Sequence, residues 1–315
     1  MATTPSATRE STEQLLQRLE WTVLRRLDGL LQGDHRTLWR GAGLDLADLR
    51  EYQHGDDVRH IDWNVTARLQ QPHVRQFTED RDLSAWFLLD LSGSVDFGSQ
   101  QRTKLAVSAD FVGAMARLLT GRGNRVGALL YGQQVDGMLP PRGGRRQVLQ
   151  LLQRMAHRPT AEAPAAGKST DLAELLGRAE TVIKRRSLVF VVSDFISAPG
   201  WSASLGRLAR RHEVLAVRLY DPLEMVLPDI GLCTVQDAET GEQLLVDTQD
   251  PGFRSRFEAL AAGHEQALRE ALAAAGVDTL ELATDDDLLA ALLRWLGLRR
   301  QRLRLPASAR LPAQA

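Results

Sequence analysis

The chain has 315 residues, of which 43% are hydrophobic and 25% are charged, so it is long enough to bury at least one full-sized core. Its 39 Lys and Arg residues balance 40 Asp and Glu residues, and the formal net charge of -1 gives no global attraction to nucleic acid or to an anionic membrane. The single cysteine, Cys233, excludes an intrachain disulfide. The single cysteine, without a Cys/His cluster, favours a reducing cytoplasm, and the balanced charge gives no reason to expect a nucleic-acid partner. Because no apolar stretch approaches the ~18 residues of a membrane span, we also expect no stable membrane insertion.

The N-terminal part of the chain contains two predicted units. Residues 1–10 are polar and are expected to be disordered, and apolar residues between Ser11 and Leu31 recur at the spacing of an amphipathic helix. Glycines, turn pairs and short extended runs such as Val74–Thr78 then replace the helical pattern. We therefore expect a disordered start and a helix within residues 1–32, followed by a small β-rich subdomain over residues 33–83.

Residues 84–298 alternate between strand-like and helical segments. The apolar run 85–90 ends in a carboxylate, as in a strand that is buried on both faces. Further strands are predicted at 125–131, 135–139, 187–194, 213–219 and 279–283. Helices are predicted at 102–119, 145–155, 171–183, 202–211, 254–275 and 285–296. This alternation predicts an α/β fold with a doubly wound, mostly parallel sheet that carries helices on both faces.

Two segments depart from this alternation. The runs CTVQ at 233–236 and LLVD at 244–247 flank the turn Ala238–Gly241, which predicts a hairpin insertion near residues 231–247. The tail over residues 299–315 carries five arginines and two prolines without any acidic residue, and we expect it to be disordered.

The first candidate site residues follow the strand at 85–90. Ligands of open α/β sheets bind beyond the carboxyl ends of the strands, so polar residues at those ends deserve inspection. The strand ends in Asp90, and Ser92 and Ser94 follow at alternate positions. In an extended chain these three side chains leave on the same side. They therefore offer three oxygen ligands in one direction.

Two further segments bring oxygen atoms to the same edge of the predicted sheet. The strand at 187–194 ends in Asp194, and Thr170 lies in the loop before a helix, beside Ser169 and Asp171, which could take its place. Hydroxyl and carboxylate oxygens without His or Cys suit a hard cation such as Mg²⁺. The residues alone therefore indicate a cation-binding crevice.

This pattern resembles the metal-ion-dependent adhesion site of von Willebrand factor A-type domains. In that site the two serines and the threonine ligate the metal directly, the aspartates bind directly or through water, and a partner's carboxylate completes the shell. The resemblance implies a site for Mg²⁺ or Mn²⁺ formed by Asp90, Ser92, Ser94, Thr170 and Asp194. The sequence departs from the pattern at Phe195, where many adhesion sites have glycine.

A second resemblance begins upstream of the first strand. The segments GAGLDLADLREYQHGDDVRHIDWNVTAR and VRQFTEDRDLSAWFLLDLSGS look like the bacterial family catalogued as domain of unknown function 58. The match runs over most of the chain. Members of that family are typically encoded beside MoxR-type AAA+ ATPases. The resemblance implies an adaptor or partner of such an ATPase, with a protein client that the sequence does not name.

The segment Gly55–Trp63 is a second dense cluster of charged residues. It offers a docking face, but a turn at Gly55-Asp56-Asp57 explains it more simply. In that interpretation its acids cap backbone amides and pair with nearby arginines, while Trp63 packs inward. We expect no direct chemistry from this segment.

An enzyme is the strongest alternative. Gly167-Lys168-Ser169-Thr170 before a helix, with a hydrophobic run that ends at Asp194, imitates the two Walker motifs of nucleotide-hydrolysing proteins. However, Glu162 stands where the first glycine of a P-loop belongs, and no strand is predicted before the loop. We expect a non-catalytic, metal-dependent protein-interaction module. A nucleotide- or phosphate-processing enzyme that uses Lys168 and Asp194 is the alternative.

Overall fold

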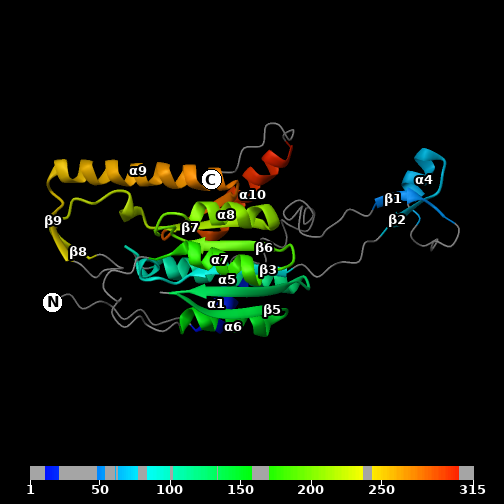
Figure 1. Ribbon diagram of the computed structural model, residues 1–315, viewed down its shortest axis with the longest axis horizontal. Helices are drawn as coiled ribbons and strands as arrows, with labels where there is room; N and C mark the ends of the chain where they lie inside the picture. The colour runs from blue at the N-terminus through cyan, green and yellow to red at the C-terminus, as the bar shows by residue number, and fades with distance from the viewer. Residues whose placement is uncertain are drawn as a thin grey trace.

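Figure 1 shows a computed structural model of the protein. The structure describes residues 11–20, 48–53, 61, 63–76, 84–99, 102–132, 134–157, 170–236 and 243–304. A six-stranded sheet forms its centre, in the order β10-β7-β6-β3-β4-β5. The strands are β3 (Ser84–Asp90), β4 (Arg125–Tyr131), β5 (Val135–Arg142), β6 (Leu188–Ser193), β7 (Glu213–Tyr220) and β10 (Asp278–Ala283).

All neighbouring strands run parallel except β5, which is antiparallel to β4 at one edge. From β3 the chain winds outward through β4 and β5, and then returns to the other side of β3 for β6, β7 and β10. The winding direction therefore reverses between β3 and β6. The predicted doubly wound, mostly parallel sheet of von Willebrand A-like type is confirmed, and its topological switch point lies at the carboxyl ends of β3 and β6.

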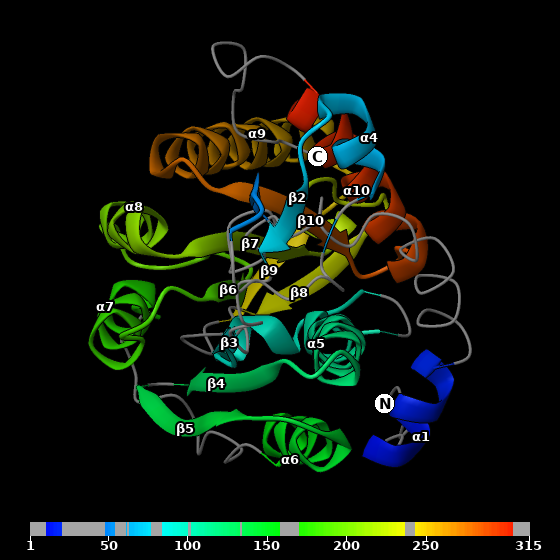
Figure 2. The same ribbon diagram turned by 90° about the vertical axis from the view of Figure 1, so that its right-hand side faces the viewer.

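Helices cover both faces of the sheet, as Figure 2 shows. One face packs against α1 (Thr12–Leu19), α5 (Lys104–Gly121), α6 (Arg145–Ala156) and α10 (Leu288–Arg304). The other packs against α7 (Leu172–Val182), α8 (Trp201–Arg211) and the C-terminal part of α9 (Pro251–Ala275).

Alternate side chains of β3 supply the two cores. Phe87 and Leu89 enter the cluster beneath α5, whereas Trp86 and Leu88 enter the cluster beneath α7. Phe87 also stacks on Phe190 of the neighbouring strand, with ring centroids 4.9 Å apart. Because both faces are covered, the central strands are apolar throughout.

Local capping fixes where the helices that border the candidate site begin. The Thr103 hydroxyl accepts a hydrogen bond from the backbone N–H of Ala106 at the start of α5, at 3.2 Å. The Asp171 carboxylate accepts from the backbone N–H of Ala173 at the start of α7, at 2.9 Å. These N-caps satisfy donors that have no partner inside the helix, and they set the positions of both helix starts at the carboxyl edge of the sheet.

The small N-terminal subdomain contains an element that its sequence pattern does not predict. Strands β1 (Asp48–Glu51) and β2 (His73–Gln76) form an antiparallel pair, as a β-rich unit requires, but the helix α4 (Trp63–Leu69) lies between them along the chain. Trp63 is 69% exposed, so the expectation that it packs inward is wrong. The described part of this stretch, a two-stranded ribbon with one short helix, offers little surface to enclose an indole ring.

Two predictions about the C-terminal third have different outcomes. The hairpin is confirmed: β8 (Leu232–Gln236) pairs antiparallel with β9 (Gln243–Asp247), although its turn lies outside the described residues. The tail prediction is wrong at its start, because α10 continues through Arg299 to Arg304. Arg299 forms ion pairs with Glu213 and Asp278 and lies over the ring of Trp295, so its charge is used to anchor the helix.

Among the described helices, none is both long enough and apolar enough to cross a membrane.

Candidate functional site

Asp90, the last residue of β3, lies at the switch point of the sheet and is 1% exposed. One carboxylate oxygen accepts a hydrogen bond from the backbone N–H of Ser92 at 3.0 Å. The other accepts from the Ser193 hydroxyl at 2.7 Å, and Ser193 is the last residue of β6. Asp90 therefore joins the ends of the two strands between which the winding reverses.

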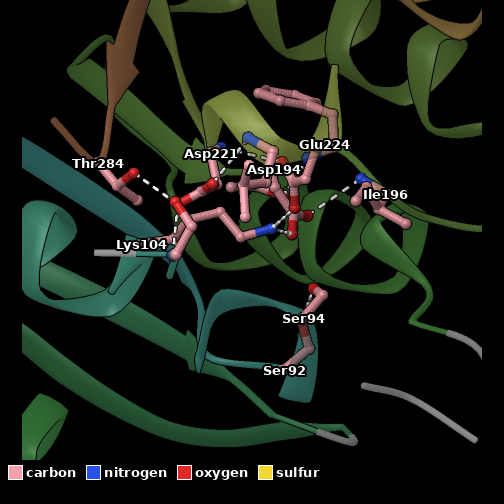
Figure 3. A network of polar contacts seen from close by, with 12 residues as sticks. Ser92, Ser94, Lys104, Asp194, Ile196, Asp221, Glu224 and Thr284 are labelled. Carbon is pink, nitrogen blue, oxygen red and sulfur yellow. Dashed lines mark hydrogen bonds and ion pairs between the residues drawn. The ribbon is translucent and has the colours of Figure 1, made fainter. Parts of the chain in front are cut away.

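Ser92 and Ser94 continue from Asp90 into a short 3₁₀ turn, η3 (Gly93–Asp96). Both serines are buried, and their hydroxyl oxygens lie 3.1 Å apart. Ser92 thus contacts both Asp90 and Ser94, and the role of the three side chains as metal ligands stays a prediction. Figure 3 shows the two serines beneath a cluster of charged residues.

Asp194 is the centre of that charged cluster. One carboxylate oxygen accepts from the backbone N–H of Ile196 at 3.1 Å, and the other accepts from the Lys104 ammonium at 2.7 Å. Lys104 also donates to the carboxylate of Glu224, at 2.6 Å. Figure 3 shows the lysine side chain reaching both acids. The cluster joins the first residue of α5, the end of β6 and the turn η4 (Pro222–Glu224).

The backbone just after Asp194 is strained. Phe195 has φ of 60°, in the left-handed region that favours glycine, although its ring is buried and lies 5.1 Å from that of Trp201. The Phe195 amide donates to the Ser193 hydroxyl, which in turn donates to Asp90. The position at which many adhesion sites have glycine is thus occupied here by a phenylalanine in a glycine-like conformation.

Thr170 is buried at the same edge of the sheet and is held there through its backbone. Its carbonyl accepts from the Ser197 hydroxyl at 3.0 Å and from the Ala198 amide at 2.9 Å. The next residue, Asp171, donates its backbone N–H to the phenol oxygen of Tyr131, which ends β4 beside Asp90. The Asp171 carboxylate is already used as the cap of α7. Ser169 lies outside the described residues.

Asp90 has no cationic hydrogen-bond donor among the residues that the structure describes. Burial and the neighbouring negative charge of Asp194 raise the pKa of Asp90 from 3.8 to about 6. Its hydrogen-bond donors, which are the backbone and side chain of Ser92 and the hydroxyl of Ser193, are neutral. An ionised carboxylate in such a place is costly unless a cation is bound near it.

Asp194 differs from Asp90 because it already pairs with a cation, the ammonium group of Lys104. Burial alone would lower the pKa of Lys104, but the charges of Asp194 and Glu224 outweigh burial and raise it. Lys104 therefore remains an ammonium ion although it is 1% exposed. The two buried carboxylates, which interact electrostatically, thus have different partners: neutral donors for Asp90 and an ammonium ion for Asp194.

The residues fit a small, hard cation. Among the described residues, no three Asp, Glu, His or Cys side chains gather closely enough to hold a metal by themselves, so a metal here would depend on hydroxyl ligands. Ser92 and Ser94 supply adjacent buried hydroxyls, and Asp90 supplies a carboxylate without a cationic hydrogen-bond donor. This donor set matches Mg²⁺ or Mn²⁺ better than zinc, which favours His and Cys.

Several sequence motifs are not placed at this site. Lys168 of the Walker-like motif lies outside the described residues, as does most of Gly55–Trp63. The sequence analysis also missed Lys104, Ser193 and Glu224. Ser193 adjoins Asp194 at a strand end and could have been found by the same rule. Lys104 is 90 positions from Asp194 along the chain, and only the folded structure reveals their contact.

Comparison with known families identifies the chain. Residues 48–267 match the model of the family described as "Protein of unknown function DUF58", and the chain belongs to this family. An uncharacterized protein of Mycobacterium tuberculosis is 39% identical over 288 residues, covering 91% of this chain and 89% of the relative. A Paracoccus denitrificans protein, described as an uncharacterized protein in the moxR 3' region, is 34% identical over 100 residues, covering 31% of this chain and 94% of the relative.

Two solved structures overlap with most of this chain at low sequence identity. The conserved hypothetical protein BatB from Bacteroides thetaiotaomicron covers 70% of this chain and 99% of its own, with 12% identity and a TM-score of 0.44. The SpRpn10 VWA domain covers 67% of this chain and 93% of its own, with 11% identity and a TM-score of 0.35.

Proposed function

We propose that this protein is a non-catalytic interaction module that binds another protein through a divalent cation, Mg²⁺ or Mn²⁺, at the carboxyl edge of its sheet. The observation that carries this proposal is the cluster of Asp90, Ser92 and Ser94 at the topological switch point. We propose that Thr170 and Asp194, which are also buried, complete the ligand set. The cation would polarise a bound carboxylate of the partner and hold it in place.

The number of ligands favours a metal site that leaves a coordination position for a partner over a site in which this chain supplies every ligand. Asp90 and Asp194 are carboxylates, and the hydroxyls of Ser92, Ser94 and Thr170 carry no formal charge. Mg²⁺ prefers six oxygen ligands and keeps several waters in most proteins. An acidic side chain of a partner can replace one such water. Association would then require the cation, the crevice and the partner's acid together.

A MoxR-type AAA+ ATPase is the partner that we propose. The support is the family resemblance and the Paracoccus denitrificans relative, whose description places it in the moxR 3' region. Cytoplasmic localisation goes with this proposal, because such an ATPase would have to reach the crevice. No individual residue indicates which client protein this protein and the ATPase would act on.

An affinity pull-down from native lysate tests this proposal. With Mg²⁺ present, the tagged protein should enrich a MoxR-type ATPase, and EDTA should release it. Equal recovery in both buffers would contradict metal-dependent binding. The enzyme alternative is tested with purified protein: ATP turnover that is lost in Lys168→Ala would show phosphate chemistry at that lysine, whereas we expect no turnover in either protein.

A further inference from the structure

Lys104 is the one fully buried lysine among the described residues, and it lies at the candidate crevice. Its ammonium contacts Asp194 at 2.7 Å and Glu224 at 2.6 Å, and the Lys104 and Asp194 side chains are each 1% exposed. The Glu224 side chain is 23% exposed and closes the cluster toward solvent. None of the five residues implied by the adhesion-site resemblance is a lysine, so this cation is an addition to that pattern.

The formal charges of the cluster indicate which charge a bound ion should carry. Asp90, Asp194 and Glu224 contribute three negative charges and Lys104 one positive charge, which leaves two negative charges when all are ionised. A divalent cation would neutralise that remainder. Lys104 is therefore a fixed monovalent cation in contact with Asp194, one of the residues proposed for the metal site.

We infer that Lys104 is a positioning residue that weakens divalent-ion binding at this crevice and keeps Asp194 out of the inner coordination shell. This inference rests on the proposed metal-dependent function. Both oxygens of Asp194 already accept hydrogen bonds, from Lys104 and from the Ile196 amide. Asp194 then acts on the metal through water, while Asp90, Ser92 and Ser94 bind it directly.

If Lys104 had a purely structural role, its removal would change metal affinity differently. If the lysine only joins α5 to β6 and η4, its removal should lower stability and leave metal affinity equal or weaker. If Lys104 competes with the metal, its removal should lower stability without metal but strengthen metal binding. The sign of the change in affinity therefore separates the two roles.

Lys104→Met is the decisive variant, because methionine keeps the length of the side chain and removes the charge. A nearby charge shifts ionic equilibria of buried groups by about one to three powers of ten, so the Kd for Mg²⁺ should fall at least tenfold. Glu224→Gln changes the system in the opposite direction. It leaves the ammonium to Asp194 alone and removes one negative charge, so the Kd should rise.

Lys184→Met is the matched control. Lys184 is exposed and follows α7 at the opposite edge of the sheet, so its loss should leave the Kd unchanged. The Kd for Mg²⁺ is measured by titration calorimetry on the full chain, and the melting temperature is recorded with and without Mg²⁺. The melting curve of Lys104→Met also shows whether this variant folds, and Glu224→Gln provides the test if it does not.

The outcomes separate this inference from the proposed function. Tighter binding in Lys104→Met, with weaker binding in Glu224→Gln, supports the inference. If wild-type protein binds Mg²⁺ and Lys104→Met binds it equally or more weakly, the metal site stands and the inference about Lys104 is overturned. If only Lys104→Met binds Mg²⁺, the inference holds and metal binding by the wild-type protein is refuted. If no variant binds Mg²⁺, both are wrong.

Discussion

The Ser193 hydroxyl donates a hydrogen bond to the Asp90 carboxylate at 2.7 Å, across the boundary where the winding of the sheet reverses. The bond joins residues that are 103 positions apart in the chain. Because Ser193 also accepts from the Phe195 amide, it couples the Asp90 carboxylate to the strained turn after β6. The position of Asp90 therefore depends on two strands and one turn together.

Divalent ions should stabilise the wild-type protein. A ligand that binds only the folded state at 100 times its Kd adds about 2.7 kcal/mol to the free energy of unfolding. Asp90→Ala should abolish this gain, because the variant lacks a buried carboxylate that, among the described residues, accepts hydrogen bonds from neutral donors alone. Melting curves with Mg²⁺, Mn²⁺ and EDTA measure the effect, and Glu258→Gln, at an exposed position of α9, is the control. An equal Mg²⁺ response in Asp90→Ala would place the ion elsewhere.

Gly98 should tolerate no side chain. A Cβ atom at this position would lie 2.2 Å from the Arg102 carbonyl oxygen and 2.6 Å from the Thr103 Cα, and both belong to the turn that leads into Lys104. Gly98→Ala should therefore destabilise the protein by about 1–3 kcal/mol. Gly177→Ala is the matched control: nothing lies within 4 Å of its Cβ, and alanine in α7 should stabilise by about 0.5–1 kcal/mol. Urea unfolding measures both, and a neutral Gly98→Ala would contradict the packing of this turn.

Asp221 should make stability depend on acid pH. Burial alone would raise the pKa of this carboxyl, but hydrogen bonds from Ser99 and Thr284 outweigh burial and hold the pKa below its usual value of 3.8. The native state therefore resists protonation more than the unfolded chain does. The resulting stabilisation is complete above pH 3.8 and is lost as pH falls through the native pKa.

Asp221→Asn tests this pH dependence. The amide leaves at least one buried donor without its acceptor, so the variant should lose about 1–3 kcal/mol of unfolding free energy at pH 7. The difference from wild type should shrink below pH 3.8, where the wild-type carboxyl is also neutralised. Urea unfolding from pH 7 to pH 2.5 measures it. A difference that is constant over this range would show that the ionisation of Asp221 does not contribute.

The sequence predicts those parts of the fold that depend on short-range patterns. The apolar run before Asp90 and the runs before Asp194 and Tyr220 become central strands, because parallel strands covered on both faces need continuous hydrophobic sequence. Helix ends are predicted less well. Arg299 has the composition of a solvated tail, but its ion pair with Glu213 depends on β7 lying beside the end of α10.

The candidate site is predictable only in part, for the same reason. Asp90, Ser92 and Ser94 are neighbours in the chain, and their alternation is visible without a structure. Lys104 and Glu224 lie 120 positions apart and have no local motif, so their contact follows from the winding of the sheet. The conformation of Phe195 could not be predicted from its residue type. Phenylalanine is unfavourable at positive φ, but the fold imposes that conformation here.

Surface plasmon resonance between this protein and a purified MoxR-type ATPase tests the central claim most directly. Binding should be measured in Mg²⁺ and in EDTA, for wild-type protein and for Ser92→Ala and Thr170→Ala, after circular dichroism has shown that both variants fold. We predict that EDTA weakens wild-type binding at least tenfold, and that the variants bind weakly even in Mg²⁺. Equal affinity in both buffers, with no effect of either substitution, would contradict metal-dependent binding at this crevice.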